Sequence, residues 1–423
     1  MKHVVIIGNG IAGITAARHI RKLSDYKITV ISEESDYFFS RTALMYVYMG
    51  DMEWRHIEPY EKDFWKKNRI DLLRSRVEAI HSENRELKMT SGEVFKYDEL
   101  ILATGSSYRR PPIKGVDCKG VFGMYSKQDF DGIWEYTKGE RYQKPKIKKA
   151  VILGGGLIGI ELAEMLTKEG IHVTMVIRDN RFYSNVVQSE ESEILERHIS
   201  SHHVRLIKSS GIDAVLSKDG VICGVRLVGG DILETEFLGL TIGVEPNVRW
   251  INEPLIQQGQ GVLVNEFLET SAPGIYAIGD CAELRAPTYG RRAIEPVWYT
   301  GRLMGECVAE NVLIPQSKKY DPGIWFNSAK FFDIEYQIYG NVAPEASADQ
   351  VHNTWQKGNA ILRVAFDKEG KLEGIQSLVT RIRHQVAEDW IRRGVSKSYL
   401  NENFEKLLFD HEFSLVYKEK INF

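Results

Sequence analysis

The chain has 423 residues, of which 43% are hydrophobic and 27% charged, and its formal net charge is −3. This composition is ordinary for a globular protein of about two to four domains, and the charge gives no reason to expect nucleic acid or an anionic membrane as a partner. No apolar run reaches the ~18 residues of a membrane-spanning helix. A strand that starts at about His3 leaves no room for a secretory signal, so we expect a cytoplasmic protein.

The chain opens on a predicted strand, a glycine-rich turn and a helix, in VVIIGNGIAGITAA (residues 4–17). Gly8, Gly10 and Gly13 have the G-x-G-x-x-G spacing of a dinucleotide-binding loop. The first glycine allows a tight turn, the second lets a pyrophosphate approach, and the third lets helix and strand pack closely. Glu33 follows 20 positions after Gly13, at the end of a strand pattern, where an acid binds a ribose hydroxyl. This favours an adenosine without a 2′-phosphate.

A second glycine-rich turn occurs in AVILGGGLIGIELA (residues 150–163), where Gly154, Gly156 and Gly159 repeat the first spacing at an offset of 146. Arg178 stands where Glu33 stands in the first copy, 19 positions after the last glycine. An arginine there accommodates a 2′-phosphate, which predicts NADPH. The alternative is a solvated surface charge with NADH as the ligand; NADPH is only slightly favoured.

Further elements follow the second turn. We expect strands at VRLI and GVICGVRLV, then a hairpin from AILRVAF and LEGIQSLV, and helices at RHQVAEDWIRRG and SYLNENFEKLLF. His202 and His203 are expected at a strand start as surface residues, and no metal site is predicted. The four cysteines (Cys118, Cys223, Cys281 and Cys307) are far apart in sequence, which favours reduced thiols over zinc ligands or a redox disulfide.

Five further segments carry a family resemblance: LILATGS (100–106), TIGVEPN (241–247), GIYAIGDCAE (274–283), IEPVWYTGRLMGE (294–306) and WFNSAKFFDIEYQIYG (325–340). With the two glycine turns, and in this order, they resemble the two-dinucleotide-binding flavoprotein oxidoreductases of the pyridine nucleotide–disulfide reductase superfamily. The likeness covers nearly the whole chain. Its nearest branch is that of ferredoxin/rubredoxin reductases and apoptosis-inducing factor.

The resemblance implies an α/β fold with two Rossmann-like dinucleotide-binding domains and an α+β C-terminal domain. The FAD-binding domain is expected at residues 1–112 and 238–320, interrupted by an NAD(P)H-binding domain at 113–237. The C-terminal interface domain is expected at 321–423, with a homodimer as one expected assembly.

The resemblance also implies the cofactors, FAD and either NADPH or NADH, with hydride passing from the nicotinamide to flavin N5. The residues expected to bind FAD are Gly8, Gly10, Gly13, Glu33, Arg41, Thr104, Gly105, Asp280, Glu295 and Trp298. Those expected to bind the nicotinamide dinucleotide are Gly154, Gly156, Gly159 and Arg178. Trp298 and Trp325 either cover the flavin or belong to the core.

The segment DYFFSRTALMYVYMG (36–50) departs from the family pattern in two ways. It has no cysteine, whereas the disulfide reductases carry a C-x-x-x-x-C pair there. Tyr46 also replaces a lysine that pairs, in the resembled branch, with the glutamate at position 161. Glu161, Arg41 and Tyr46 are therefore the candidate catalytic residues. Glu161 either pairs with Arg41 or has a raised pKa in an apolar site. Tyr46 either contacts the flavin or is core, with core slightly favoured.

The expected activity is that of an NAD(P)H:acceptor oxidoreductase whose electrons leave the flavin for an external ferredoxin- or rubredoxin-like protein. Two alternatives stay open. TALMYVYMG also resembles a segment of type II NADH dehydrogenases, which reduce quinone, and the apoptosis-inducing-factor branch suggests a slow NAD(P)H-sensing protein. The aromatic, lysine-containing tail (406–423) is either an amphipathic membrane contact or, as we favour, a packed segment.

Overall fold

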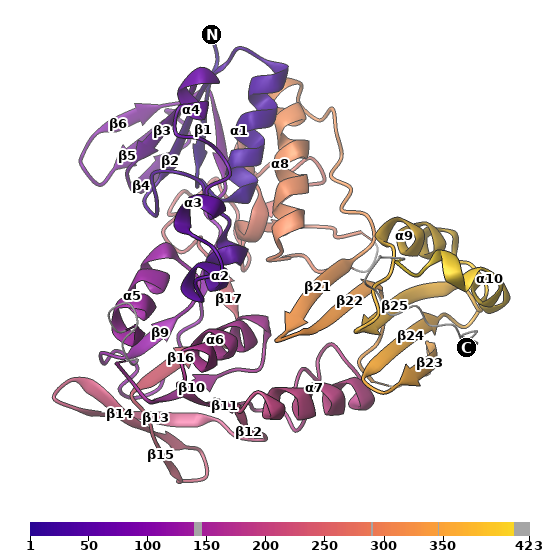
Figure 1. Ribbon diagram of the computed structural model, residues 1–423. Coiled ribbons are helices and arrows are strands. Elements are labelled where there is room, and N and C mark those ends of the chain that lie inside the picture. The colour runs from indigo at the N-terminus through magenta and orange to yellow at the C-terminus, as the bar shows by residue number, and fades with distance from the viewer. Residues whose placement is uncertain (139–145, 289–290, 346, 410–423) are drawn as a thin grey trace. The chain divides into compact units, whose positions relative to one another are not determined.

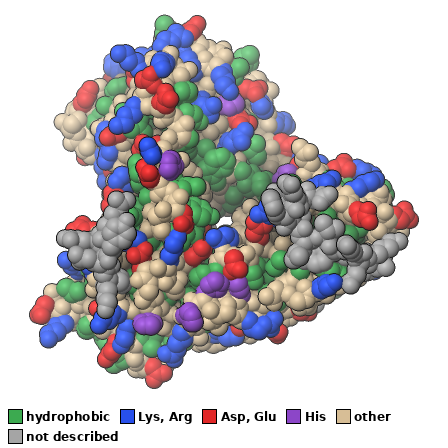
Figure 2. All heavy atoms as spheres, viewed as in Figure 1, with side chains coloured by type: hydrophobic (Ala, Val, Ile, Leu, Met, Phe, Trp, Pro, Cys, Tyr) green, Lys and Arg blue, Asp and Glu red, His purple; other side chains and the backbone are tan. Residues whose placement is uncertain are grey.

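The computed structural model describes residues 1–138, 146–288, 291–345 and 347–409. The chain divides into two compact units, each built from segments far apart in sequence (Figure 1). Unit 1 comprises Met1–Arg109, Gly123–Tyr136 and Gly243–Pro322, and unit 2 comprises Arg110–Phe122, Thr137–Ile242 and Gly323–Phe423. Basic and acidic side chains are interspersed on the face drawn in Figure 2, in line with the small net charge.

The centre of unit 1 is a five-stranded parallel sheet with the strand order β19-β7-β1-β2-β3. Its strands are β1 (His3–Ile7), β2 (Lys27–Ser32), β3 (Ile70–Arg74), β7 (Glu99–Leu102) and β19 (Ile275–Ala277). The apolar sequence of β1 is buried almost throughout, as expected for a parallel strand covered on both faces.

Two helices of unit 1 lie side by side, α1 (Ile11–Leu23) and α8 (Trp298–Leu313), coloured indigo and orange in Figure 1. Gly305 allows this close approach, because a Cβ there would lie 2.6 Å from the carbonyl oxygen of Ala12. The long helix α8 therefore fixes the position of α1, which begins at the first glycine turn.

The remaining strands of unit 1 form smaller sheets. β4 (Val77–His81), β5 (Glu86–Met89) and β6 (Val94–Lys96) are antiparallel, and two pairs join β8 (Ser106–Tyr108) to β17 (Val244–Pro246) and β18 (Val262–Val264) to β20 (Ala282–Leu284). The shorter helices are η1 (Arg41–Ala43), α2 (Leu44–Tyr48), α3 (Trp54–Ile57), α4 (Phe64–Lys67), α5 (Lys127–Thr137) and η2 (Gly279–Cys281).

Unit 2 repeats this architecture around a sheet with the order β12-β11-β10-β16-β9, in which the β10–β11, β10–β16 and β11–β12 pairs are parallel. Its strands are β9 (Val121–Gly123), β10 (Lys149–Leu153), β11 (His172–Val176), β12 (Arg205–Ile207) and β16 (Phe237–Leu240). Helices α6 (Leu157–Lys168) and α7 (Ser189–Ser201) follow β10 and β11, and an antiparallel sheet contains β13 (Ile212–Lys218), β14 (Val221–Leu227) and β15 (Ile232–Glu234).

The C-terminal part of unit 2 is an antiparallel sheet with the order β21-β22-β25-β24-β23. Its strands are β21 (Phe326–Phe331), β22 (Ile334–Gly340), β23 (Val351–Lys357), β24 (Ala360–Phe366) and β25 (Leu372–Leu378). Helices α9 (His384–Arg393), α10 (Lys397–Asn403) and η3 (Phe404–Lys406) follow. Leu362, Ile375, Trp390 and Leu400 are members of the buried cluster between these helices and the sheet.

The α/β fold class is confirmed, and the expected strands and helices of both halves are present. One placement was wrong: His202 ends α7 and β12 starts only at Arg205, because the helical burial pattern of Ile194, Leu195 and Ile199 continues up to this point. Residues 410–423 of the aromatic tail lie outside the described residues. None of the helices that the structure describes combines the length and apolarity that crossing a bilayer requires.

Candidate functional site

The first glycine loop (residues 8–13) joins β1 to α1 and has the geometry that its spacing predicted. Gly8 has φ +114°, and a Cβ there would lie 2.0 Å from the carbonyl oxygen of Ala103. A Cβ at Gly13 would lie 2.0 Å from the carbonyl oxygen of Gly8, whereas a Cβ at Gly10 would meet no atom within 4 Å. The first and third glycines thus permit close packing, while the second faces open space at the N-terminus of α1. This is the arrangement that a pyrophosphate requires.

The first glycine loop lines a cavity of about 690 Å³ in unit 1, a volume typical of cofactor sites. Most residues expected to bind FAD lie on its wall: Gly8, Gly10, Glu33, Arg41, Thr104, Gly105 and Asp280. Gly13 does not line the cavity but packs against the carbonyl group of Gly8 in the loop. Segments from four parts of the chain therefore converge on one cavity.

Glu33 follows β2, the strand beside β1, and its side chain is exposed at the cavity wall. Its Oε2 lies 3.2 Å from Nη1 of Arg76, an exposed ion pair that leaves the carboxylate open to solvent. On the opposite side of β1, Thr104 follows β7 and donates a hydrogen bond to the carbonyl oxygen of Asn247 at 2.9 Å. Glu33 thus lies at the cavity wall, and its contact with a ribose hydroxyl stays a prediction.

Arg41 binds Glu34 at two points, with Nη1–Oε1 at 2.8 Å and Nη2–Oε2 at 2.6 Å, and also donates to the carbonyl oxygen of Tyr125. Burial opposes the charge on Glu34, but the hydrogen bond and the attraction from Arg41 outweigh it and lower the pKa of Glu34. Burial likewise opposes the charge of Arg41, and Glu34 outweighs it, so the pKa of Arg41 is raised. Both groups therefore stay charged at the cavity wall.

Asp280 is held by two hydroxyl groups at the same cavity. The Ser106 and Tyr125 hydroxyl oxygens each lie 2.7 Å from Oδ2 of Asp280 and 2.6 Å from each other. Burial and the negative charge of Asp280 raise the pKa of Tyr125, so its phenol remains a hydrogen-bond donor. Both hydroxyl contacts use the same carboxylate oxygen, Oδ2 of Asp280.

The second glycine loop (residues 154–159) reproduces the first in unit 2. Gly154 has φ +122°, and a Cβ there would lie 2.4 Å from the carbonyl oxygen of Thr241. A Cβ at Gly159 would lie 2.6 Å from the carbonyl oxygen of Gly154, and a Cβ at Gly156 would meet no atom within 4 Å. The same division between packing glycines and an open one therefore occurs twice in the chain, which fits a second dinucleotide.

Arg178 lies two positions beyond the end of β11, the strand next to β10. Its side chain is 85% exposed, and its ion-pair contact with Asp179 is long, at 3.7 Å between Nε and Oδ1. Arg178 in unit 2 therefore has the position that Glu33 has in unit 1, at the carboxyl end of the strand beside the glycine loop. The side chain is accessible from solvent, and its contact with a 2′-phosphate stays a prediction.

Glu161 is a half-buried residue of α6, four positions after the start of that helix. Burial, helped by repulsion from Glu164, raises the pKa of Glu161 to about 7. Glu164 itself pairs with Lys330 at 3.0 Å. Burial in unit 2 thus raises the pKa of Glu161, and its pairing with Arg41 of unit 1 stays a prediction.

Besides Gly13, three residues expected at the flavin are not among the residues that line the cavity of unit 1: Tyr46, Glu295 and Trp298. Tyr46 is half-buried in α2. Glu295 is buried and pairs at two points with Arg291, with Nε–Oε1 at 2.8 Å and Nη2–Oε2 at 2.5 Å. Trp298 begins α8 and is 40% exposed. Their expected contacts with the flavin stay predictions.

Glu34, Ser106 and Tyr125 line the cavity but were not singled out by sequence. Glu34 is adjacent to Glu33, and Ser106 ends the LILATGS segment, so each had a nearby signal. Tyr125 had none, because it belongs to a segment between β9 and α5 without a glycine motif.

Comparison with known proteins gives a consistent picture. Residues 2–302 match the family described as pyridine nucleotide-disulphide oxidoreductase. The NAD(P)H coenzyme A polysulfide/persulfide reductase of Pyrococcus horikoshii is 31% identical over 353 residues, which are 82% of this chain and 77% of that protein. The 5,5'-dehydrodivanillate O-demethylase ferredoxin reductase subunit of Sphingobium sp. is 30% identical over 342 residues, 79% of this chain and 81% of that protein.

A nitrite reductase of Bacillus subtilis is 27% identical over 337 residues, but the chain spans only 40% of its length. Among solved structures, the ferredoxin reductase for the CYP199A2 system from Rhodopseudomonas palustris has a TM-score of 0.79 at 24% identity. That match covers 89% of this chain and 91% of the other, and it shows a shared fold.

Proposed function

The chain belongs to the pyridine nucleotide-disulphide oxidoreductase family, and from that premise we propose that it passes electrons from NAD(P)H through FAD to a small ferredoxin- or rubredoxin-like protein. The family's enzymes are FAD-dependent NAD(P)H oxidoreductases. When bound, the nicotinamide would supply a hydride and the flavin would accept it and release electrons singly.

The observation that carries the proposal is the duplicated glycine loop. Gly10 and Gly156 both face open space, while the first and third glycines of each motif are packed against backbone. The first loop borders the 690 Å³ cavity with Glu33, which suits FAD. The second is followed by the exposed cation of Arg178, which suits NADPH. We therefore assign FAD to unit 1 and NADPH to unit 2, with NADH as the alternative.

Within the cavity, the proposed roles follow from the contacts. Glu33 binds the adenosine ribose, and Asp280, oriented by Ser106 and Tyr125, accepts a hydrogen bond from a hydroxyl of the flavin's sugar-alcohol chain. Arg41 places a fixed positive charge on the wall, balanced by Glu34. Glu161 has a pKa of about 7, so it exchanges its proton near neutral pH and is our candidate for tuning the nicotinamide contact.

A protein acceptor is favoured by the distribution of cysteines. Cys118, Cys223, Cys281 and Cys307 are all free thiols, and residues 36–50 contain none. A disulfide-type substrate would require a redox cysteine in that segment, by the resemblance described above, so electrons leave from the flavin directly. The ferredoxin reductase subunit from Sphingobium is a relative with such a partner by name. Free thiols also suit a reducing compartment, and we propose the cytoplasm.

The test is steady-state oxidation of NADPH by the flavin-loaded protein with three acceptors: a two-iron ferredoxin, a rubredoxin, and a water-soluble ubiquinone analogue. The iron proteins are monitored through cytochrome c reduction. We expect at least one iron protein to be reduced about tenfold faster or more than the quinone. A faster quinone would favour the type II dehydrogenase alternative. If none of the three acceptors reoxidises the reduced flavin, the sensing alternative is favoured. Light scattering separately gives the oligomeric state.

A further inference from the structure

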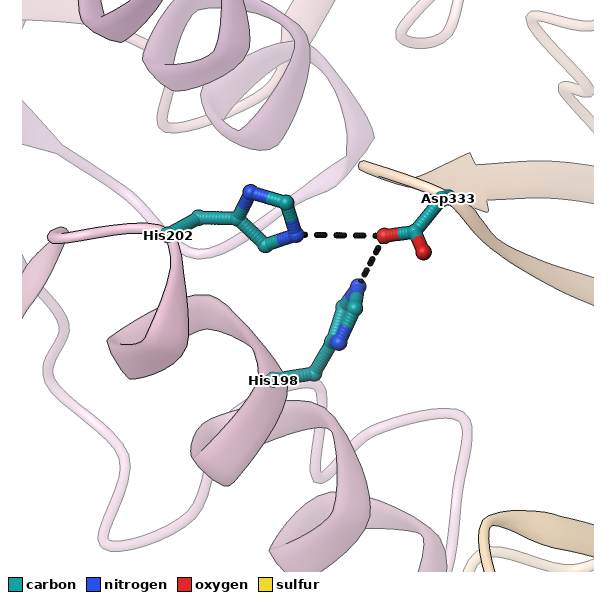
Figure 3. Close-up of side chains that lie close together, drawn as sticks. All are labelled: His198, His202 and Asp333. Atoms are coloured by element: carbon teal, nitrogen blue, oxygen red, sulfur yellow. Dashed lines mark hydrogen bonds and ion pairs between the residues drawn. The ribbon is translucent and has the colours of Figure 1, made fainter.

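Two histidines and an aspartate of unit 2 converge at the end of α7, outside both glycine loops (Figure 3). His198 lies in the last turn of α7, and His202 directly follows the last residue of the helix. Asp333 belongs to the two-residue loop between β21 and β22. Its Oδ1 lies 2.6 Å from Nε2 of His198 and 3.1 Å from Nε2 of His202. One potential ligand atom from each residue lies within 4.8 Å of the others.

The imidazole rings are held in place by their surroundings. His198 and His202 are four positions apart, so they project from one face of the helix, and their ring centroids are 4.7 Å apart. The ring of His202 stacks on Phe332 at 4.2 Å with an interplanar angle of 5°. Packing therefore fixes the ring whose Nε2 points toward Asp333, as Figure 3 shows.

The loop that carries Asp333 has an unusual backbone. Phe332, its first residue, is buried and has φ +56°, a conformation for which two-residue hairpin loops normally use glycine, asparagine or aspartate. A bulky aromatic residue in this conformation is strained. In this strained loop, Phe332 contacts His202, and the following residue, Asp333, faces both imidazoles.

Both imidazoles face the same carboxylate oxygen. His198 Nε2 is buried, and it lies 2.6 Å from Oδ1 of Asp333. Asp333 is 77% exposed and His202 38% exposed, so an ion and water can reach the cluster from solvent.

We propose that His198, His202 and Asp333 bind a divalent transition-metal ion, zinc in the first place. Two imidazoles and one carboxylate form a ligand set that suits zinc, and not calcium or magnesium, which prefer oxygen ligands. Three protein ligands leave a fourth position for water. In a tetrahedral site with bonds of about 2.1 Å, neighbouring ligand atoms lie about 3.4 Å apart. The present contacts would therefore widen by less than about 1 Å, which the exposed Asp333 side chain permits.

The bound ion would connect the β21–β22 loop to the C-terminal end of α7. The N-terminal end of this helix is already joined to β24 through Glu191 and Arg363. The ion would thus add a metal-dependent connection to those that already join the parallel-sheet part and the C-terminal part of unit 2, such as the pair of Glu164 and Lys330. Its contribution would be to stability, because ion binding to the folded state alone stabilises that state.

The test is isothermal titration of the untagged, EDTA-treated, flavin-loaded full chain with ZnCl₂. We expect a single site with one ion per chain, and about tenfold weaker binding or more in Asp333→Asn and in His198→Ala. Asp333 is exposed, so the Asp333→Asn variant keeps its fold, which circular dichroism and flavin content check. His203→Asn is the matched control: this exposed neighbour lies outside the cluster, and its zinc binding is expected to equal that of the wild type.

A thermal melt gives an independent readout. Zinc is expected to raise the melting temperature of the wild type and of His203→Asn, but not that of Asp333→Asn. MgCl₂ and CaCl₂ are expected to leave all three unchanged. The proposal is overturned if zinc binds the wild type no tighter than it binds Asp333→Asn. It is also overturned if both Asp333→Asn and His198→Ala retain the bound ion. The cluster would then be only an ion pair between Asp333 and the two histidines.

Discussion

Arg363 of β24 binds Glu191 of α7 at two points, with Nε–Oε1 at 2.8 Å and Nη2–Oε2 at 3.0 Å. The side chains are 4% and 0% exposed, so the pair is shielded from water. Glu190 adds a second carboxylate 3.2 Å from Nη2 of Arg363. This buried pair joins the C-terminal sheet of unit 2 to the helix that follows β11.

Removing one partner of this pair should destabilise unit 2 strongly. Arg363→Leu leaves the Glu191 carboxylate buried without its counter-charge, which lowers the free energy of unfolding by about 3–5 kcal/mol. Urea unfolding followed by tryptophan fluorescence measures this. Arg381→Leu is the control, because it breaks an exposed pair with Glu335 and should cost less than about 1 kcal/mol. If the two variants lose the same free energy of unfolding, the buried pair stabilises the protein no more than the exposed pair does.

The two kinds of glycine in the first loop should respond differently to alanine. In Gly10→Ala the methyl group enters open space, so the fold survives but the protein should lose bound FAD, because the methyl group would occupy the path of the pyrophosphate. In Gly13→Ala the methyl group would lie 2.0 Å from a carbonyl oxygen, so folding itself should suffer. Flavin content and melting temperature separate these effects, and a Gly10→Ala protein with full flavin content would contradict the assignment.

Arg178 should determine the preference for NADPH. Because its side chain is 85% exposed, Arg178→Glu should leave stability unchanged within about 0.5 kcal/mol. The KM for NADPH should rise about tenfold or more while that for NADH changes little, since only NADPH carries the 2′-phosphate. Arg205→Glu makes the same charge change at the start of β12, where Arg205 pairs with Thr174 of β11, and serves as the control. If both variants raise the KM for NADPH equally, Arg178 acts only as a general surface charge.

The raised pKa of Glu161 makes stability depend on pH. Between the ordinary value of 4.5 and about 7, the folded state keeps a proton on Glu161 that the unfolded chain releases. Stability therefore falls as the pH rises through this window, because the ionised carboxylate is disfavoured at its half-buried site. Glu161→Gln should match the wild type near pH 4.5 and exceed it by on the order of 1–3 kcal/mol at pH 8. Glu193→Gln makes the same change at an exposed position of α7 and serves as the control.

Sequence predicted the fold and the glycine loops well, because their signals are local. Strand, turn and helix are contiguous in residues 4–17 and 150–163, and each glycine has a distinct steric reason. The partners of Arg41 and Asp280 could not be predicted, because Tyr125 approaches them across more than 80 positions without a motif.

The cluster of His198, His202 and Asp333 has both a local signal in the sequence and a contact between distant segments. His198 and His202 have a spacing of four, but the expected strand start concealed the helix that makes this spacing meaningful. Asp333 is 131 positions from His202, and only the loop between β21 and β22 brings the two together. Contacts between distant segments depend on tertiary packing, which no local pattern records.

We infer that one chain binds FAD at its first glycine loop and a reducing nicotinamide dinucleotide at its second. An anaerobic titration of the purified protein with NADPH and then NADH, following flavin absorbance, tests it most directly. We predict a yellow protein with one FAD per chain that NADPH bleaches, with NADH less effective. A protein that neither contains flavin nor binds added FAD, or a bound flavin that neither nucleotide reduces, would contradict the account.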